Sequence, residues 1–388
     1  MLVVMTSIIA SANEQGAKVV CGPYVQNVTE TGYSVTWVTD IDAISWVETA
    51  PDDGCHFYGR NRTRHYDKRG YGVHPIGKIH RVTVEGLEPG KIYRYRIFNK
   101  GVLSFTGNSD IKYTKTTATD VWLGKPHKVR TLRKDYDTLR FDIYNDIHGK
   151  DSLLGVLMEG ARKDLDFVVF NGDMTSNIEN HEMIQSMYLA TAAEKLKGST
   201  PIVASRGNHE LRGRDAVRWC DYFETPTGQT YYSLKMGDYL IIVLDGCEDK
   251  PDDSFEYNGT INTEYYMRSE ETWLKEVIAS DDFKSAKVRM VFCHIPPEKS
   301  GWFGNINVCD YFVSHLNGAG IDVMFCGHIH KWRVDEPGCG FSDADFPVIC
   351  IPNIQRAEVT ATESGIELDI FDTEGEKTHS WDYDYSHK

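Results

Sequence analysis

Five short polar segments between residues 145 and 330 carry the residue types that bind metal ions. In chain order they are Asn145-Asp146-Ile147-His148-Gly149, Asn171-Gly172-Asp173, Gly207-Asn208-His209-Glu210, Phe292-Cys293-His294 and Cys326-Gly327-His328-Ile329-His330. They offer carboxylate oxygens, imidazole nitrogens and an amide oxygen, which are donors that transition metals take in proteins. Each segment follows an apolar, strand-like run. Because ligand sites in open α/β sheets form at the carboxyl ends of strands, we expect the five loops to converge.

The elements that must position these loops begin near Leu139, where strands alternate with amphipathic helices. The pattern predicts strands at 141–145, 166–170 and 201–204, and helices at 153–163 and 181–197. This alternation favours a parallel or mixed sheet with helices packed against it.

The chain before this region has a different pattern of apolar and polar residues. Residues 19–117 alternate apolar and polar side chains, as in Tyr33-Ser-Val-Thr-Trp37, with turn clusters between the runs, which is typical of an all-β sandwich. The string Leu87-x-Pro89-Gly90-x-x-Tyr93 resembles the E–F corner of fibronectin type III and immunoglobulin-like domains, in which the tyrosine hydroxyl binds nearby backbone. The polar, basic stretch 118–137 is expected to be a linker.

Composition limits the classes of function. Among 388 residues, 57 Asp and Glu exceed 42 Lys and Arg, and the net charge of −15 argues against nucleic acid as the partner. No apolar run approaches the ~18–20 residues of a membrane span. Nine cysteines without regular spacing do not indicate a disulfide framework. We expect His56, His65, His74 and His80 at the surface.

The first 18 residues suggest a leader. The apolar run Leu2–Ala10 and the Ala10-Ser11-Ala12 string resemble the core and cleavage site of a secretory signal, although no Lys or Arg precedes the run. An exported protein, periplasmic or extracellular, is therefore favoured over a cytoplasmic one.

The five segments in their order resemble the calcineurin-like metallophosphoesterase superfamily, whose pattern is D-x-H, G-D, G-N-H-D/E, H and G-H-x-H. The similarity covers about residues 139–332 and implies an α+β fold for residues 138–388, a four-layer α/β/β/α sandwich. It also implies two metal ions, with Asp173 bridging them. The first ion would be held by Asp146, His148, Asp173 and His330, and the second by Asp173, Asn208, His294 and His328.

Such a site suits phosphate chemistry. Two carboxylates and a bridging hydroxide leave two divalent ions with a net charge of about +1, which attracts a phosphate ester. The resemblance implies attack by the metal-bridging hydroxide and assigns His209 to protonate the leaving oxygen.

The later part of the chain, together with the sandwich in front, is similar to purple acid phosphatases and their bacterial relatives. Those enzymes read D-x-G and G-D-x-x-Y, where the tyrosinate binds ferric iron. Here His148 replaces the glycine and Ser176 occupies the tyrosine position. The imidazole supplies the ligand that the tyrosine would provide, so we expect no purple colour. Mn, Zn and Fe all remain possible.

The sequence thus predicts a hydrolase of small phosphate monoesters, with a phosphodiesterase acting on a nucleotide or a lipid headgroup as the alternative. A rival of another class is an adhesion or carbohydrate-binding protein that uses residues 19–117. The arginines at 206, 212, 214 and 218 could bind a phosphate but are more typical of ion-paired surface residues. Trp302 and Phe303 could form an apolar wall for a leaving group. The sequence does not indicate an oligomeric state.

Overall fold

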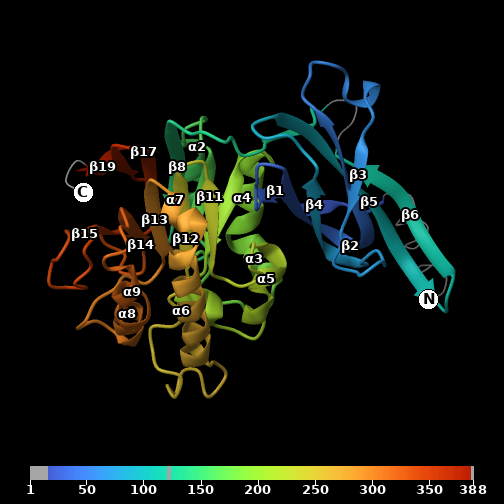
Figure 1. Ribbon diagram of the computed structural model, residues 1–388. Coiled ribbons are helices and arrows are strands. Elements are labelled where there is room, and N and C mark those ends of the chain that lie inside the picture. The colour runs from blue at the N-terminus through green and yellow to red at the C-terminus, as the bar shows by residue number, and fades with distance from the viewer. Residues whose placement is uncertain (1–15, 120–123, 386–388) are drawn as a thin grey trace. The chain divides into compact units, whose positions relative to one another are not determined.

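The computed structural model describes residues 16–119 and 124–385, which divide into two compact units (Figure 1). Unit 1 comprises the described residues up to Arg133 together with Leu196–Pro201, and unit 2 comprises Lys134–Lys195 and the residues from Ile202 onward. The expected leader at 1–18 lies, up to residue 15, outside the described residues.

Unit 1 is an all-β domain, as predicted. Its strands are β1 (Val19–Gln26), β2 (Gly32–Pro51), β3 (Thr63–Tyr66), β4 (Gly77–Glu85), β5 (Ile92–Thr106), β6 (Asp110–Ala118) and β7 (His127–Arg130), with a short 3₁₀ helix, η1 (Phe57–Gly59). The long strand β2 organises the unit. Its first half pairs with β1 and β4, and after a register shift between Val38 and Ala43 its second half pairs with β3 and β5.

Two local features of unit 1 relate to expectations from the sequence. The hydroxyl of Tyr93 accepts a hydrogen bond from the backbone N–H of Glu88 at 3.0 Å, which is the contact expected of the tyrosine corner. The stretch expected to be a linker contains a regular strand, β7, which pairs antiparallel with β5.

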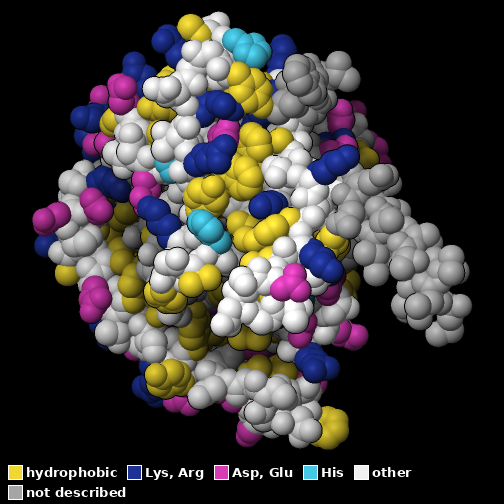
Figure 2. Space-filling view, turned by 90° about the vertical axis from the view of Figure 1, so that its right-hand side faces the viewer, with side chains coloured by type: hydrophobic (Ala, Val, Ile, Leu, Met, Phe, Trp, Pro, Cys, Tyr) yellow, Lys and Arg dark blue, Asp and Glu magenta, His cyan; other side chains and the backbone are white. Residues whose placement is uncertain are grey.

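A row of aromatic side chains crosses one face of the sheet in unit 1. Tyr66, Trp46 and Phe98 stand opposite one another on β3, β2 and β5, with ring centroids 5.9 and 5.3 Å apart. Figure 2 views the side on which β3, β5 and β6 are drawn in Figure 1, and it shows hydrophobic side chains gathered there among Lys and Arg. Cross-strand aromatic pairs of this kind stabilise a sheet.

Unit 2 contains two sheets. The first has the order β19-β18-β17-β8-β9-β10. Its strands are β8 (Thr138–Tyr144), β9 (Phe167–Asn171), β10 (Pro201–Ser205), β17 (Arg356–Thr362), β18 (Gly365–Phe371) and β19 (Lys377–Asp384). Strands β8, β9 and β10 run parallel, so the loops after them open at the same edge.

The second sheet has the order β11-β12-β13-β14-β16-β15. Its strands are β11 (Tyr232–Met236), β12 (Tyr239–Leu244), β13 (Val288–Cys293), β14 (Val323–Cys326), β15 (Arg333–Asp335) and β16 (Val348–Cys350). Strands β12, β13, β14 and β16 are parallel neighbours and almost wholly buried. Near-continuous apolar strands of this kind are expected where both faces of a sheet are covered.

Helices connect these strands. They are α2 (Asp151–Glu159), α3 (Glu182–Ile184), α4 (Ala190–Leu196), α5 (Trp219–Tyr222), α6 (Thr263–Ala279), α7 (Asp281–Ser285), α8 (Phe303–Val308) and α9 (Ser314–Leu316). Shorter or irregular turns are η2 (Gln185–Leu189), η3 (Asn208–Leu211), η4 (Ala216–Arg218) and η5 (Cys309–Val313). The helix predicted at 181–197 is interrupted by a π-helical turn, η2, which joins α3 to α4.

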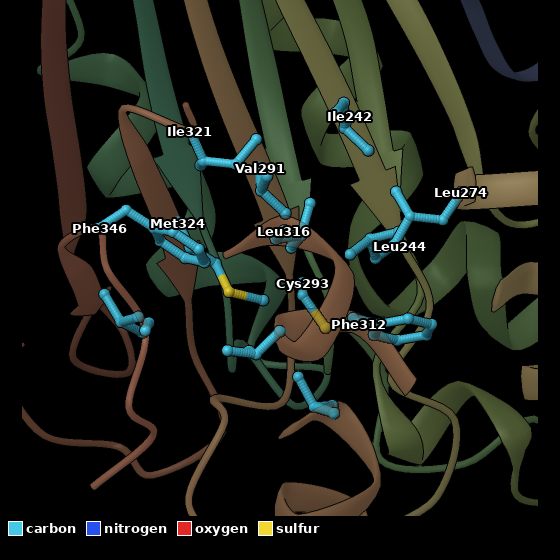
Figure 3. Close-up of a cluster of buried hydrophobic side chains, with 14 of the residues drawn as sticks. Ile242, Leu244, Leu274, Val291, Cys293, Phe312, Leu316, Ile321, Met324 and Phe346 are labelled. Carbon is cyan, nitrogen blue, oxygen red and sulfur yellow. The ribbon is translucent and has the colours of Figure 1, made fainter. Parts of the chain in front are cut away.

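The two sheets pack face to face, with helices outside them. Phe141 of β8 contacts Phe292 of β13 and Phe325 of β14, with ring centroids 5.8 and 6.1 Å apart. On the outer side of the second sheet, Ile242, Val291 and Met324 meet residues of α6, η5 and α9 in a buried cluster (Figure 3). The predicted α/β/β/α arrangement is confirmed. Among residues 16–119 and 124–385, no helix has the length and apolar character needed to cross a bilayer.

Cys293, Cys326 and Cys350, the last residues of β13, β14 and β16, are fully buried, and all nine cysteines are free thiols. One histidine expectation is wrong. His56 and His74 are exposed and His65 is half-buried, but His80 of β4 is buried against Trp37 and shares a 2.8 Å hydrogen bond with the Thr39 hydroxyl. A histidine whose polar atom has a partner can be buried in its neutral form.

Burial lowers the pKa of His80 from 6.5 to about 4. The unfolded state therefore binds this proton more tightly, and stability is lost as pH falls from about 6.5 towards 4. We expect His80 to contribute roughly 3 kcal/mol to that loss. The measurement is urea unfolding of wild type and His80→Gln across this range. The variant should lose this part of the pH dependence, whereas His56→Gln, at an exposed position, should retain it. Parallel pH profiles for wild type and His80→Gln would contradict the prediction.

Candidate metal centre

The loops at one edge of the two sheets hold unusual backbone conformations. Asp146, His148, Asp173, His328 and His330 all have positive φ, between 50° and 69°. Asp, Asn and His adopt this left-handed region more readily than most residues, but the conformation still costs free energy. Strained backbone conformations of this kind are common at functional sites, because they orient side chains in directions that a regular loop would not allow.

One group of donors comes from the loops after β8 and β14. The Oδ1 atom of Asp146 lies 3.1 Å from Nε2 of His330 and 3.7 Å from Nε2 of His148. The two imidazole Nε2 atoms are 3.1 Å apart. Three donor atoms this close form a cluster that could hold one ion.

A second group lies next to the first. Asp173 Oδ2 is 3.1 Å from His294 Nε2, and His328 completes this cluster. The amide oxygen of Asn208 lies 3.1 Å from Nδ1 of His328. Asp173 Oδ2 also lies 4.0 Å from Nε2 of His148, which belongs to the first group. Asp173 therefore stands between the two groups.

Three of these donor atoms have no hydrogen-bond partner in the protein, which is the state expected of metal ligands. Asp146 Oδ1, His294 Nε2 and His328 Nε2 are buried and have no hydrogen-bond partner. Buried polar atoms without partners are costly and need an explanation, such as an ion. The opposite atoms of the same side chains are satisfied: His294 Nδ1 lies 2.8 Å from the Asn171 carbonyl oxygen. Donation of the Nδ1 proton to that carbonyl leaves the Nε2 lone pair for a metal, as is usual for ligating histidines.

The electrostatics of the pocket favour a cation. Burial disfavours the protonated form of His294, but the carboxylates of Asp173 and Asp146 outweigh burial and raise its pKa to about 10. Burial would likewise raise the pKa of Asp173, yet His294 and His209 bring it well below its usual range. Two buried carboxylates thus create a negative potential that a proton or a metal ion can neutralise.

Glu210, to which sequence reasoning gave no role, fixes two of the loops together. Its buried carboxylate accepts hydrogen bonds from the backbone N–H groups of Asp173 and Thr175, both at 2.8 Å, and of Gly207 at 2.9 Å. Gly207 is also required for close approach, because a Cβ there would lie 2.3 Å from Asp173 Oδ1. The final acidic position of the Gly-Asn-His-Glu segment was the signal that could have identified this role.

His209 lies beside the two groups. Its Nε2 is 3.8 Å from Asp173 Oδ2, and its Nδ1 is 2.8 Å from the Ser176 carbonyl oxygen. Arg212 donates to His209 Nε2 at 3.1 Å. The guanidinium of Arg212 is itself held by Glu248 at 2.8 Å and Asp249 at 3.1 Å.

Two of the other arginines near this loop are held in ion pairs. Arg206 pairs with Asp245 at 2.7 Å, and Arg218 pairs with Asp221 at 2.8 Å. Arg214 is exposed.

A cavity of about 610 Å³ opens over the centre. Its floor includes Asp173, Asn208, His209, His328 and His330, and its walls include Asp249, Glu298 and Trp302. Phe303, expected beside Trp302 as an apolar wall, is the first residue of α8 and is not among the lining residues. The structure thus brings all eight site residues predicted from the sequence to one place, and five of them line a cavity large enough for a small ester.

Comparison with known proteins agrees with this geometry. The calcineurin-like phosphoesterase family matches residues 139–332, and the N-terminal domain of purple acid phosphatases matches residues 23–116. Purple acid phosphatase 21 of Arabidopsis thaliana is 22% identical over 78% of this chain and 63% of its own length. The serine/threonine-protein phosphatase CPPED1 of Pongo abelii is 24% identical over 34% of this chain and 42% of its own length. The chain therefore spans less than two thirds of either relative.

A solved structure of PhoD has the same fold. It superposes with a TM-score of 0.62 at 14% identity, covering 96% of this chain and 91% of that one. With the matched segment running through all five motif loops, and with a purple acid phosphatase N-terminal domain in front, the chain belongs to the calcineurin-like phosphoesterase family.

Proposed function

We propose that this protein hydrolyses small phosphate monoesters at a centre of two metal ions. The observation that carries the proposal is the pair of adjoining donor groups that meet at Asp173, with buried donor atoms that have no protein partner. Both curated relatives are named phosphatases, which supports a phosphate ester as substrate.

The ligand assignment follows the two groups. Asp146, His148, Asp173 and His330 would hold one ion, and Asp173, Asn208, His294 and His328 the other, with Asp173 shared. The nitrogen and oxygen donors suit Mn, Zn or Fe. When bound, such a pair supplies Lewis acidity towards phosphate oxygens and a nucleophile at neutral pH.

The chain's own residues then orient the ester and move a proton. His209 donates its Nδ1 proton to the Ser176 carbonyl, so Nε2 is the atom that turns towards the centre. From there it would protonate the leaving oxygen, as a general acid does. In this structure Arg212 donates to the same Nε2 atom at 3.1 Å, so the proton that His209 delivers must take the place of this contact. The cavity walls would keep the leaving group over this histidine.

Two further proposals concern the whole chain. We propose that residues 138–388 form the catalytic domain behind a fibronectin III-like sandwich at 19–117, and that the leader at 1–18 directs export. Expression in a bacterial host, with fractionation and N-terminal sequencing of the mature chain, tests the second. A monoester preference is tested by comparing p-nitrophenyl phosphate with its bis-ester; faster turnover of the bis-ester would favour a phosphodiesterase.

Asp173→Asn should lower kcat by more than about 100-fold, because even the loss of a residue that supports a ligand costs about 10–100-fold. The metal content should fall as well. Phosphatase assays and metal analysis of the purified variant provide the measurement. Asp253→Asn, at an exposed position, is the matched control and should match wild type. Full activity in Asp173→Asn would refute the assignment of Asp173 as the shared ligand.

The protein loaded with iron should lack the visible band of a tyrosinate–iron pair. Ser176 occupies the position of that tyrosine, and within the described chain no tyrosine lines the cavity over the centre. A visible spectrum of the oxidised, iron-loaded protein is the test. Ser176→Tyr would show whether the position can restore the band. A purple wild-type protein would contradict the assignment of His148 as a ligand.

Glu210→Gln should weaken metal binding by about 10–100-fold. The glutamine amide keeps one oxygen, so its NH2 group would face either the N–H groups of Asp173 and Gly207 or that of Thr175, and the unfolding free energy should fall by about 1–3 kcal/mol. Metal titration and urea unfolding report the two effects. Glu276→Gln, on the exposed face of α6, should change neither. Unaltered affinity in Glu210→Gln would mean that the loops hold their positions without it.

A further inference from the structure

One wall of the cavity over the centre carries a large aromatic side chain. Trp302 lines this cavity and is 65% exposed. Its ring centroid lies 5.6 Å from that of His328, at an interplanar angle of 89°. The indole therefore stands within reach of whatever is attached to a phosphate at the centre.

The exposure of Trp302 does not come from a loosely held segment. Its backbone N–H donates to Asn305 Oδ1 at 3.0 Å, and the buried Asn305 amide donates to the Pro296 carbonyl at 2.7 Å. Gly304 packs so tightly that a Cβ there would lie 2.6 Å from the Glu248 carbonyl oxygen. The backbone of Trp302 is thus anchored on the core while its large apolar side chain remains in water, where a partner ring could cover it.

The charges around the cavity restrict which charged groups the leaving group of a substrate can have. Asp249 and Glu298 add carboxylates to the wall, and within residues 16–119 and 124–385 no lysine or arginine lines it. Two guanidinium groups are held by acidic residues of this region: Arg212 by Glu248 and Asp249, and Arg333 by Glu298 at 2.9 Å. A second phosphate that lay against this wall would meet its carboxylates, and the described lining has no lysine or arginine to bind it.

We infer that Trp302 binds the leaving group by stacking, and that the substrate is a monoester of an alcohol that carries a planar aromatic ring and no second phosphate. This inference rests on the proposed function. Aryl phosphates and nucleoside monophosphates share this chemistry; they differ in whether the ring is attached directly or through a ribose. Ring stacking on an exposed aromatic side chain is strong enough to change affinity by about tenfold.

Binding is tested first, without turnover, by calorimetry on the metal-loaded full chain with phenyl-, cyclohexyl- and methylphosphonate. Wild type should bind phenylphosphonate about tenfold more tightly than the other two. Trp302→Ala should lose that preference with methylphosphonate unchanged, and Trp302→Phe should keep most of it. Tyr265→Ala, which removes a 70% exposed aromatic side chain from α6, is the control and should behave as wild type. Equal binding of the three phosphonates by wild type, or equal weakening of all three in Trp302→Ala, would overturn the inference.

Hydrolysis assays then show whether aryl phosphates or nucleoside monophosphates are the substrates. Phenyl phosphate, adenosine 5′-monophosphate, adenosine 3′,5′-bisphosphate and glycerol phosphate are compared. Trp302→Ala should lower kcat/KM about tenfold, through KM, for phenyl phosphate, for the nucleotide, or for both, with glycerol phosphate within about twofold of wild type. The bisphosphate should be a poor substrate. Uniform loss on every substrate, or efficient turnover of the bisphosphate, would overturn the inference.

Different results would refute the proposed phosphatase activity and the aromatic subsite. A metal-loaded wild type that hydrolyses none of the four esters would refute the proposed phosphatase, while a phenylphosphonate preference that depends on Trp302 would still support the aromatic subsite. Conversely, hydrolysis of all esters with no role for Trp302 would leave the phosphatase proposal intact and refute the subsite.

Discussion

The structure depends on two carboxylates, Asp146 and Asp173, buried side by side among histidine side chains. Their oxygens lie 3.8 and 3.1 Å from the same atom, His294 Nε2. Two negative charges taken out of water so near one another repel each other and lose hydration, so they require positive charge between or around them. The raised pKa of His294 shows the strength of that demand. Metal ions meet the same demand with higher charge, and they also satisfy donor atoms that no protein group reaches.

The four-layer fold brings these groups together because each sheet contributes part of the centre. Asp146, Asp173 and Asn208 follow strands of the first sheet, while His294, His328 and His330 follow strands of the second. The distance between the two sets is set by the packing of Phe141 against Phe292 and Phe325. A change in this aromatic layer would therefore alter the site without touching a ligand, since interiors transmit small displacements.

Much of this could be predicted from the sequence, because the pattern of strands followed by polar loops is local and the edge at which parallel strands end is a property of the fold. That pattern predicts that the five loops converge, whereas the roles of the eight site residues and the layer order come from the resemblance of the five segments to calcineurin-like phosphoesterases. Features that depend on contacts between distant segments could not be read in the same way. The Nε2 atom of His80 is hydrogen-bonded to the hydroxyl of Thr39 on another strand, and Glu210 accepts hydrogen bonds from backbone N–H groups of another loop. The exposure of Trp302 depends on Asn305 and Gly304 holding its backbone against the core. Single residues in a pattern do not reveal such partners.

The most direct test of this account is a crystal structure of the metal-loaded protein with anomalous diffraction recorded at the metal absorption edge. The account predicts two anomalous peaks about 3.5–4 Å apart, with the Asp173 carboxylate between them and His330 and His294 on different ions. A single peak, or two ions that do not share Asp173, would contradict the central claim that this chain builds a two-metal centre around its buried carboxylates.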